Sequence, residues 1–516
     1  MPTLVATLAE VSARVAGTSL RTAKVRELAQ ALRAFEPAEI EIGVLYLSGE
    51  TRQGRIGLQY SALRAAVDVS PAERPTLTLG DLDAALDELA SIRGPGSTQR
   101  RIQRLRDLTA LATPGERDFI LRLLLGELRQ GALGGVMIEA IANAAQVPVA
   151  LVRRAAMYAQ RLGAVAHAAL LEGAEGLARF ELTLLSPVAP MLAQTAADVA
   201  DAFEQLGNNE VGLEWKVDGA RIQVHKAEDV VRIFTRNAND VTAAVAEIAA
   251  AVTRLPARSL VLDGEAVAVT ATGRPHPFQT TMRRFGRKLD VAALQTELPI
   301  RAYFFDCLFV DGHSITDRPL RERLEALAQV VPESLRMPRL VTASHAEAQS
   351  FYDAAIDAGH EGLMAKSLDA PYEAGNRGAS WLKIKRTHTL DLVVLAAEWG
   401  HGRRAGKLSN LHLGAYEPAT GEYVMLGKTF KGLTDEKLIW QTQALLQLET
   451  HRDRHTVYVK PRLVVEIAFS ELQVSSRYKG GLALRLARVK RYRLDKTPSE
   501  ADDMNAVRRI GMGNRG

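Results

Sequence analysis

The sequence contains a single cysteine, Cys307, among 516 residues. One thiol excludes an internal disulfide and any zinc site built from cysteines alone. Long apolar runs are also missing, because no segment approaches the roughly 18 uncharged apolar residues that a membrane helix requires. The first stretch holds Glu10 and Arg14 among its apolar residues and has no basic leader, unlike a signal peptide. These absences predict a cytoplasmic protein without zinc and without a membrane segment.

Neither sign of charge dominates, since 65 basic and 60 acidic residues leave a net charge of +5. So mild an excess does not by itself indicate nucleic acid. The basic residues nevertheless form two runs near opposite ends of the chain, which favours a polyanionic partner over two solvated charged faces. The candidates for contact with phosphate groups are Arg100, Arg101, Arg104, Arg485, Arg488 and Arg491.

A chain of this length predicts two to four domains. Residues 1–190 show helical periodicity with capping signals and hold no catalytic constellation, which predicts an all-α domain. Strands alternate with helices over residues 191–387, typical of an α+β domain. Short strands with one helix between them over residues 388–500 favour a small β-barrel of the OB-fold type. Residues 501–516 are expected to form a flexible tail.

The stretch LEWKVDGARIQVH, residues 213–225, places a lysine among strand-forming residues. Lys216 has the acids Glu214 and Asp218 two positions away on each side, and Gly219 follows. An Asp-Gly pair after a strand is most often a simple turn, so this motif alone is weak evidence of function.

The order of the later motifs indicates a function for Lys216 that the lysine motif alone does not. Lys216 is followed along the chain by a basic strand end, an acidic strand, an aromatic strand, a second acid and a lysine pair. Lys383 and Lys385 are two residues apart, so on a strand both side chains share one face. Phe304 and Phe305 alternate, so only one of these rings can stack on a ligand. The other members of the series are Arg221, Arg236, Glu265 and Glu361.

This series resembles the covalent nucleotidyltransferases, and specifically the ATP-dependent DNA ligases. EWKVDGAR resembles the family's nucleotidyl-lysine motif K-x-D-G with its following arginine, and LDGEAV, FFDCLFVDG, EGLMAK and WLKIKR follow in the family's order. LGKTFKGLTDE and LRLARVKRYRLDK resemble motifs of its C-terminal OB-fold, and GELRQGALGGVMIEAIANA resembles a helix of its N-terminal DNA-binding domain. The chain departs from many relatives at Leu486 and Ala487, where they have Phe-Pro.

The resemblance implies a helical DNA-binding domain, an α+β adenylation (nucleotidyltransferase) domain and an OB-fold. It implies a monomer that uses ATP and Mg²⁺ or Mn²⁺ on nicked double-stranded DNA, with Lys216 as the catalytic nucleophile. Glu265 and Glu361 would bind the metal, as hard oxygen ligands suit Mg²⁺. The implied ATP-binding residues are Glu214, Arg221, Arg236, Glu265, Phe305, Arg377, Lys383 and Lys385.

A lysine amine attacks phosphorus only when neutral, and an unperturbed lysine has a pKa of about 10.4. Nearby cations and partial desolvation lower such a pKa, and Lys383, Lys385 and a divalent ion would supply the positive field. Lys383 and Lys385 would also neutralise charge on the α-phosphate. Arg221 and Arg236 would hold ribose and phosphate, and Phe305 would stack on adenine.

Other interpretations stay open at this point. An RNA ligase or a GTP-using capping enzyme shares the lysine motif, although the helical residues 1–190 disfavour both. An NAD-dependent ligase is disfavoured by the single cysteine, because that family carries a four-cysteine zinc site. A non-catalytic nucleic-acid clamp would use the basic runs alone.

Overall fold

The computed structural model describes residues 2–54, 56, 60–128, 130, 134–159, 161–207, 209–270, 273–276, 278–286, 297–374, 378–386, 388–401 and 404–513. The chain divides into two compact units. The first comprises Met1–Ala196, Ala200–Ala348 and Met364–Lys383, and the second comprises Ala197–Val199, Gln349–Leu363 and Ile384–Gly516. Among the described residues, no helix combines the length and the apolar character needed to cross a membrane.

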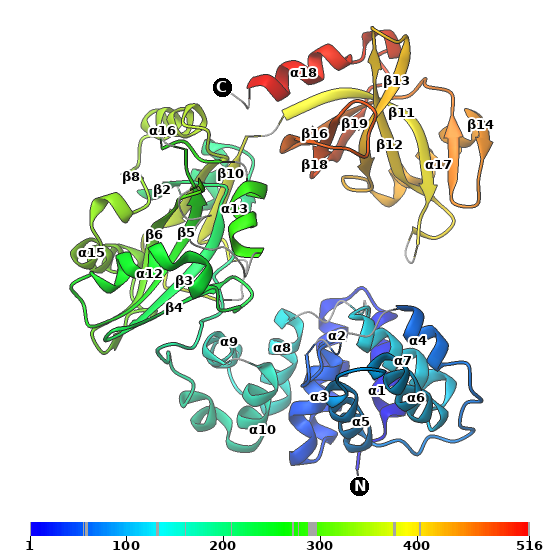
Figure 1. Ribbon diagram of the computed structural model, residues 1–516, viewed down its shortest axis with the longest axis vertical. Coiled ribbons are helices and arrows are strands. Elements are labelled where there is room, and N and C mark those ends of the chain that lie inside the picture. The colour runs from blue at the N-terminus through cyan, green and yellow to red at the C-terminus, as the bar shows by residue number, and fades with distance from the viewer. Residues whose placement is uncertain are drawn as a thin grey trace. The chain divides into compact units, whose positions relative to one another are not determined.

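The N-terminal region is helical, as the periodicity predicts (blue to cyan in Figure 1). Apolar faces of these helices meet in one core that includes Leu8, Leu32 and Leu86. Thr113 and Glu116 form the expected capping box at the start of α7, with Pro114 in the first turn. The helices are α1 (Val5–Ala16), α2 (Arg21–Ala34), α3 (Ile40–Leu47), α4 (Tyr60–Ala66), α5 (Leu79–Ser91), α6 (Ser97–Ala110), α7 (Pro114–Leu125), α8 (Gly134–Ala145), α9 (Val149–Tyr158) and α10 (Leu162–Ala178).

The middle region contains two five-stranded sheets, which confirms the α+β prediction. The first has the order β1-β10-β9-β2-β8 and the second the order β4-β3-β5-β6-β7. The strands of the first are β1 (Gln194–Ala196), β2 (Val211–Trp215), β8 (Arg339–Thr342), β9 (Gly362–Ser367) and β10 (Trp381–Lys385). Those of the second are β3 (Ala220–Ala227), β4 (Val230–Thr235), β5 (Ser259–Ala268), β6 (Ile300–Val310) and β7 (His313–Ser314).

Helices α12 (Ala246–Thr253) and α15 (Leu320–Val330) pack against the second sheet. Val252 and Leu327 from these helices share a core with Leu262 and Phe304 from the strands. Phe304 is fully buried there, whereas Phe305 belongs to a different apolar cluster. Alternation along β6 therefore separates the two rings as the sequence predicts. The region also contains α11 (Val199–Gln205), α13 (Phe278–Gly286) and α16 (His345–Asp357).

The C-terminal region is rich in strands and has a curled seven-stranded sheet, in agreement with the predicted small barrel. The long strand β11 pairs with β12 on one edge. On the other edge its first half pairs with β16 and its second half with β15, which curls the sheet. The elements are β11 (His388–Trp399), β12 (Leu408–Glu417), β13 (Glu422–Thr429), α17 (Asp435–Gln447), β14 (Glu449–Arg452), β15 (Thr456–Val459), β16 (Val464–Phe469), β17 (Glu471–Val474), β18 (Leu482–Arg485) and β19 (Arg488–Tyr492).

The expectation of a flexible tail over residues 501–516 is wrong for most of that segment. Residues Met504–Gly513 form helix α18. Met504 and Val507 are fully buried in the core of the barrel, and the carboxylate of Asp502 accepts a hydrogen bond from the backbone N–H of Asp391 at 2.7 Å. The apolar residues Met504, Val507 and Ile510 recur at helical spacing, and this short pattern was the signal for a packed helix.

Candidate active site

Lys216 lies where the chain passes from one sheet to the other. Strand β2 ends at Trp215 in the first sheet, and β3 begins at Ala220 in the second. Gly219 is needed in this crossing because a Cβ there would lie 2.5 Å from the carbonyl oxygen of Ala266 on β5. Gly219 therefore allows the backbone of the crossing segment to lie close to β5.

Glu265 shares the electrostatic environment of Lys216. It lies on β5, opposite Arg221 of β3 in the strand register. Burial raises the pKa of Glu265 to about 7, while the cations of Lys216 and Arg221 pull it down and the carboxylates of Asp263 and Asp218 push it up. The half-buried carboxyl group of Glu265 and the lysine of the K-x-D-G motif thus share one electrostatic environment, and their roles stay predictions.

Each carboxylate oxygen of Glu214 has a cationic partner inside the protein. The side chains of Glu214 and Lys366 are each only 2% exposed, and Lys366 Nζ lies 2.5 Å from Glu214 Oε2. Arg339 Nη2 lies 2.6 Å from the other oxygen, Oε1. Burial is the main reason that the pKa of Lys366 is lowered, and Glu214 opposes this effect. The predicted contact of Glu214 with the nucleotide stays a prediction.

Aromatic and cationic groups surround Phe305. Its ring meets that of Trp381 edge-on, with 5.9 Å between the centroids. Lys366 Nζ lies 4.4 Å from the centroid of Phe305 and 4.1 Å from that of Trp381, and the guanidinium carbon of Arg221 lies 5.5 Å from the centroid of Phe305. Cations over ring faces attract the negative face of the π-system. Trp381 and Lys366 were not among the predicted site residues, although both stand in the WLKIKR and EGLMAK motifs.

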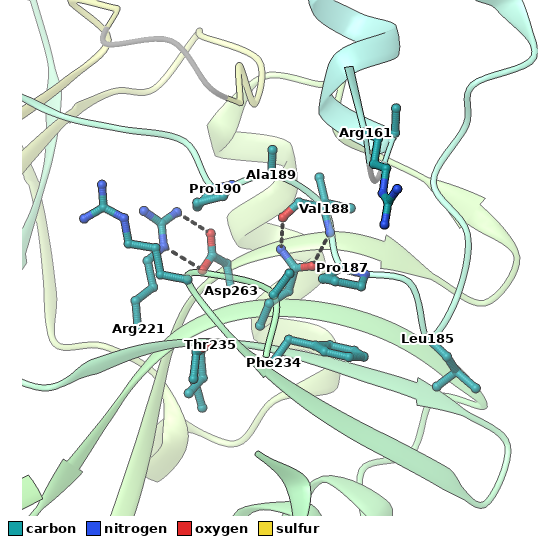
Figure 2. A pocket seen from close by; sticks show the side chains of 15 residues that line it. Arg161, Leu185, Pro187, Val188, Ala189, Pro190, Arg221, Phe234, Thr235 and Asp263 are labelled. Carbon is teal, nitrogen blue, oxygen red and sulfur yellow. Dashed lines mark hydrogen bonds and ion pairs between the residues drawn. The ribbon is translucent and has the colours of Figure 1, made fainter. Parts of the chain in front are cut away.

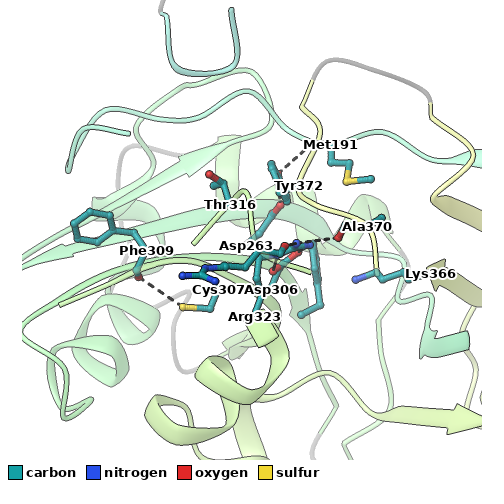
Figure 3. A network of polar contacts seen from close by, with 12 residues as sticks. Met191, Asp263, Asp306, Cys307, Phe309, Thr316, Arg323, Lys366, Ala370 and Tyr372 are labelled. Carbon is teal, nitrogen blue, oxygen red and sulfur yellow. Dashed lines mark hydrogen bonds and ion pairs between the residues drawn. The ribbon is translucent and has the colours of Figure 1, made fainter. Parts of the chain in front are cut away.

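A second network holds the arginine that follows the lysine motif. Arg221 Nη2 lies 2.6 Å from Asp263 Oδ2, and Arg221 Nη1 donates to the carbonyl oxygen of Met191 at 2.5 Å. The hydroxyl of Tyr372 donates to the same Asp263 oxygen at 2.7 Å (Figure 3). Burial lowers the pKa of Arg221, but the carboxylate of Asp263 outweighs this effect and raises it above its usual value. Sequence reasoning missed Asp263 and Tyr372, although Asp263 stands two residues before Glu265 in LDGEAV.

Figure 2 shows a pocket of about 550 Å³ beside this network. Its lining includes Arg221, Arg236 and Asp263, together with residues 187–190 that lead into the middle region. Arg236 is exposed just after β4. Two predicted nucleotide-binding arginines thus meet at one pocket, while Lys216 is not part of that lining.

Lys383 and Lys385 alternate with buried residues along β10, so they share a face as predicted. Lys385 Nζ lies 2.7 Å from Glu361 Oε2, which pairs one predicted phosphate-binding cation with one predicted metal ligand. Arg377 lies outside the described residues. Within the described part of the chain, no three His, Cys, Asp or Glu side chains gather as a metal ligand set. Mg²⁺ commonly takes only one or two carboxylates with water and phosphate oxygens, so its predicted site stays a prediction.

The predicted DNA-contacting arginines of α6 have structural partners. Arg100 donates to the carbonyl oxygen of Arg93 at 2.7 Å, and Arg101 donates to that of Ile92 at 2.8 Å. Arg104 forms an ion pair with Glu88 of α5. Cations near the C-terminal end of a helix also favour its dipole, so these arginines brace α6 against the end of α5.

In the barrel the second basic run is divided between paired and exposed groups. Arg485 lies 2.7 Å from Glu471, and Arg491 lies 2.7 Å from Glu466. Arg488 is exposed at the start of β19. Leu486 has a positive φ of 56° and links β18 to β19, at the position where the motif departs from its relatives.

Three family models match consecutive parts of this chain. They are described as DNA ligase N terminus over residues 5–142, ATP dependent DNA ligase domain over residues 190–385 and ATP dependent DNA ligase C terminal region over residues 404–496.

Whole-length relatives agree with these matches. A protein named probable DNA ligase from Anaeromyxobacter sp. strain Fw109-5 is 58% identical over 98% of this chain and 97% of its own length. Another of that name from Sorangium cellulosum is 57% identical over 99% of this chain and 96% of its own length. A solved structure titled Pmar-Lig_PreS3 shares the fold, with a TM-score of 0.61 and 17% identity over 94% of this chain and 99% of that one. The chain belongs to the ATP-dependent DNA ligase family.

Proposed function

We propose that this protein seals nicks in double-stranded DNA in three steps. The neutral amine of Lys216 attacks the α-phosphorus of ATP, forming a P–N bond and expelling pyrophosphate. The AMP then passes to the 5′-phosphate at a nick, which frees the lysine. The 3′-hydroxyl finally attacks the activated 5′-phosphate, forms the phosphodiester bond and releases AMP.

The observation that carries this proposal is the position of Lys216 in the crossing between the two sheets, where it interacts electrostatically with the half-buried carboxyl group of Glu265. Groups that bind nucleotide would gather around this crossing. Phe305 would stack on adenine, with Lys366 and Trp381 fixing its ring. Arg221 and Arg236 would hold the sugar and phosphates at their shared pocket, and Lys383 would neutralise the charge that develops on the α-phosphate.

A divalent ion, Mg²⁺ or Mn²⁺, fits Glu265. Its raised pKa means that burial penalises the ionised carboxylate, and a bound cation would relieve that penalty. Such an ion would supply positive charge to the phosphates of ATP. Glu361, the other proposed ligand, would have to exchange its ion pair with Lys385 for the metal.

The helical region and the barrel would each contact the DNA. Exposed basic groups such as Arg488 support this role, because phosphate contacts dominate DNA affinity. We propose a monomer without zinc, located in the cytoplasm, with domain boundaries near residues 190 and 387. The limits of the family matches at residues 190–385 support these boundaries.

Nick sealing with ATP and Mg²⁺ tests the proposal, with GTP and NAD as alternative donors. Lys216→Ala should abolish covalent attachment of AMP, because the substitution removes the nucleophile. As a control, the same variant should still seal a nick whose 5′-phosphate is already adenylylated, since that step does not use the amine as a nucleophile. Mass spectrometry should find one AMP on the peptide that holds Lys216; a label on Lys383 would contradict the assignment.

A further inference from the structure

The face of β3 that carries Arg221 also holds the segment through which the chain enters the middle region. We call this segment, residues 185–191, the strap. Arg221, Gln223 and His225 alternate along β3, so their side chains share one face of the strand. Each of the three side chains forms a hydrogen bond with the backbone of the strap. Side chains of one strand therefore hold the strap at both of its ends and in the middle.

Gln223 holds the middle of the strap by a contact at two points. Its Oε1 accepts a hydrogen bond from the backbone N–H of Val188 at 2.7 Å, and its Nε2 donates to the carbonyl oxygen of Val188 at 3.2 Å (Figure 2). Both residues are buried. Because a buried backbone group needs a hydrogen-bond partner, loss of the Gln223 amide would release Val188 from β3.

His225 holds the first end of the strap and fixes the orientation of the Gln223 amide. The backbone N–H of Leu185 donates to His225 Nδ1 at 3.1 Å, so this nitrogen is the acceptor and Nε2 carries the proton. Nε2 then donates to Gln223 Oε1 at 2.9 Å. Burial lowers the pKa of His225 to about 4, which keeps the ring neutral at pH 7. Leu185 has a positive φ of 64°, which leucine rarely adopts, so the turn at this residue depends on such support.

The other end of the strap contacts the guanidinium group of Arg221. The carbonyl oxygen of Met191 accepts a hydrogen bond from Arg221 Nη1 at 2.5 Å, and the backbone N–H of Met191 donates to the hydroxyl of Tyr372 at 3.1 Å. Asp263 binds the guanidinium group through Nε at 3.1 Å and Nη2 at 2.6 Å. The planar group is thus oriented from two directions, and one of them is the strap.

We propose that Gln223 is a positioning residue, which keeps the strap on β3 and thereby orients Arg221 for ATP. This role rests on the proposed contact of Arg221 with the sugar and phosphates of the nucleotide. Gln223 lines the same pocket as Arg221. Its oxygen already accepts hydrogen bonds from Val188 and His225, and its nitrogen donates to Val188. Gln223 therefore acts on ATP through Arg221.

The rate of AMP attachment to the full-length protein, measured against ATP concentration, tests this role. Gln223→Met keeps the size of the side chain and removes both hydrogen bonds to Val188. It should raise the KM for ATP about tenfold and leave kcat within about twofold, because a contact with bound nucleotide is weakened. Gln223→Glu keeps the acceptor oxygen and removes the donor, so it should raise the KM less. Should Gln223→Met fail to fold, Gln223→Glu carries the same test.

Gln130→Met is the matched control for the loss of a buried glutamine. Gln130 lies in the helical region, where its amide oxygen accepts from the hydroxyl of Ser12 at 2.5 Å and its nitrogen donates to the carbonyl oxygen of Leu47. It does not line the pocket that contains Arg221. Gln130→Met should therefore keep the wild-type KM for ATP. A KM raised equally by Gln130→Met and Gln223→Met would overturn the positioning role, because any loss of packing would then have the same effect.

A double variant shows whether Gln223 acts through Arg221. Arg221→Lys keeps a cation beside Asp263 but lacks the planar fork that binds Asp263 and Met191 together, so it should raise the KM for ATP about tenfold. Adding Gln223→Met to Arg221→Lys should change the KM by less than about twofold, because the group that the strap orients is already gone.

Two results would overturn the positioning role while leaving Arg221 at the nucleotide. A further tenfold rise of the KM in the double variant would show that Gln223 contacts ATP itself. A wild-type KM in both variants of Gln223, together with a raised KM in Arg221→Lys, would show that the strap does not orient Arg221. A wild-type KM in Arg221→Lys would instead overturn the proposed contact of Arg221 with ATP, and the role of Gln223 with it.

Discussion

The ion pairs of Glu214 allow a prediction about how the crossing segment is held. Lys366→Met removes the partner of Glu214 Oε2 but leaves Arg339 on Oε1. A hydrogen bond to a charged group contributes about 1.5–3 kcal/mol, and removing the buried ammonium recovers part of its desolvation penalty. We expect a loss of about 2 kcal/mol in the free energy of unfolding. Glu214→Gln should cost more, about 3–5 kcal/mol, because it leaves two cations without their anion.

The chain has several domains, so unfolding of the whole protein is not a two-state measurement. Hydrogen exchange followed by mass spectrometry resolves the peptides of β2 and β8 separately and reports local opening. Both variants should exchange faster in β2, and both should attach AMP more slowly because Lys216 follows two residues after Glu214. The double variant of Lys366→Met and Glu214→Gln should lower the free energy of unfolding by less than the sum of the two single losses, because the two residues interact.

Lys226→Met is a matched control for the loss of a buried lysine. Lys226 lies in β3 and donates to the carbonyl oxygens of Thr253 and Leu255 at 3.0 and 2.7 Å. Its loss should accelerate exchange in the second sheet and leave β2 unchanged. Equal destabilisation of β2 by Lys366→Met and Glu214→Gln would contradict this role of the ion pairs, and so would β2 exchange at the wild-type rate in both variants.

Three further predictions follow from the pKa shifts and the exposed charge. The carboxyl group of Glu265 ionises near pH 7 because burial raises its pKa, so the rate of AMP attachment should rise as pH increases through about 7; the same inflection in Glu265→Gln would show that another group titrates. Burial lowers the pKa of His225 from 6.5 to about 4. Between these pH values His225 binds a proton in the unfolded chain but not in the folded chain. The free energy of unfolding should therefore fall as pH drops from about 6.5 to about 4. Thermal melts of His225→Leu should lose this part of the pH dependence, and an unchanged slope would contradict the assignment. Arg488→Ala should reduce the slope of log affinity against log salt for nicked DNA by about one, whereas the ion-paired Arg491 should contribute less, as gel-shift titrations would show.

The sequence by itself determined the features that depend on near neighbours. Alternation along one strand placed Phe304 and Phe305 on opposite faces, and the same rule put Lys383 and Lys385 on one face. The start of α7 was predicted from Thr113, Pro114 and Glu116, because a capping box is a contact between residues three apart. The order of the motifs along the chain identified the family.

Only the tertiary structure decided which partners these side chains have. Glu214 meets Arg339 across 125 residues because β2 pairs with β8, and no local pattern encodes that pairing. The arginines at positions 100 and 101 donate to backbone carbonyls near the end of α5, so part of a basic run that favours DNA contact in the sequence serves packing. Helix α18 packs its apolar face, with Met504 and Val507, into the core of the barrel, because the barrel offers this face a partner surface. Burial and long-range pairing arise only when distant segments exclude water together, and short-range propensity does not specify which segments will do so.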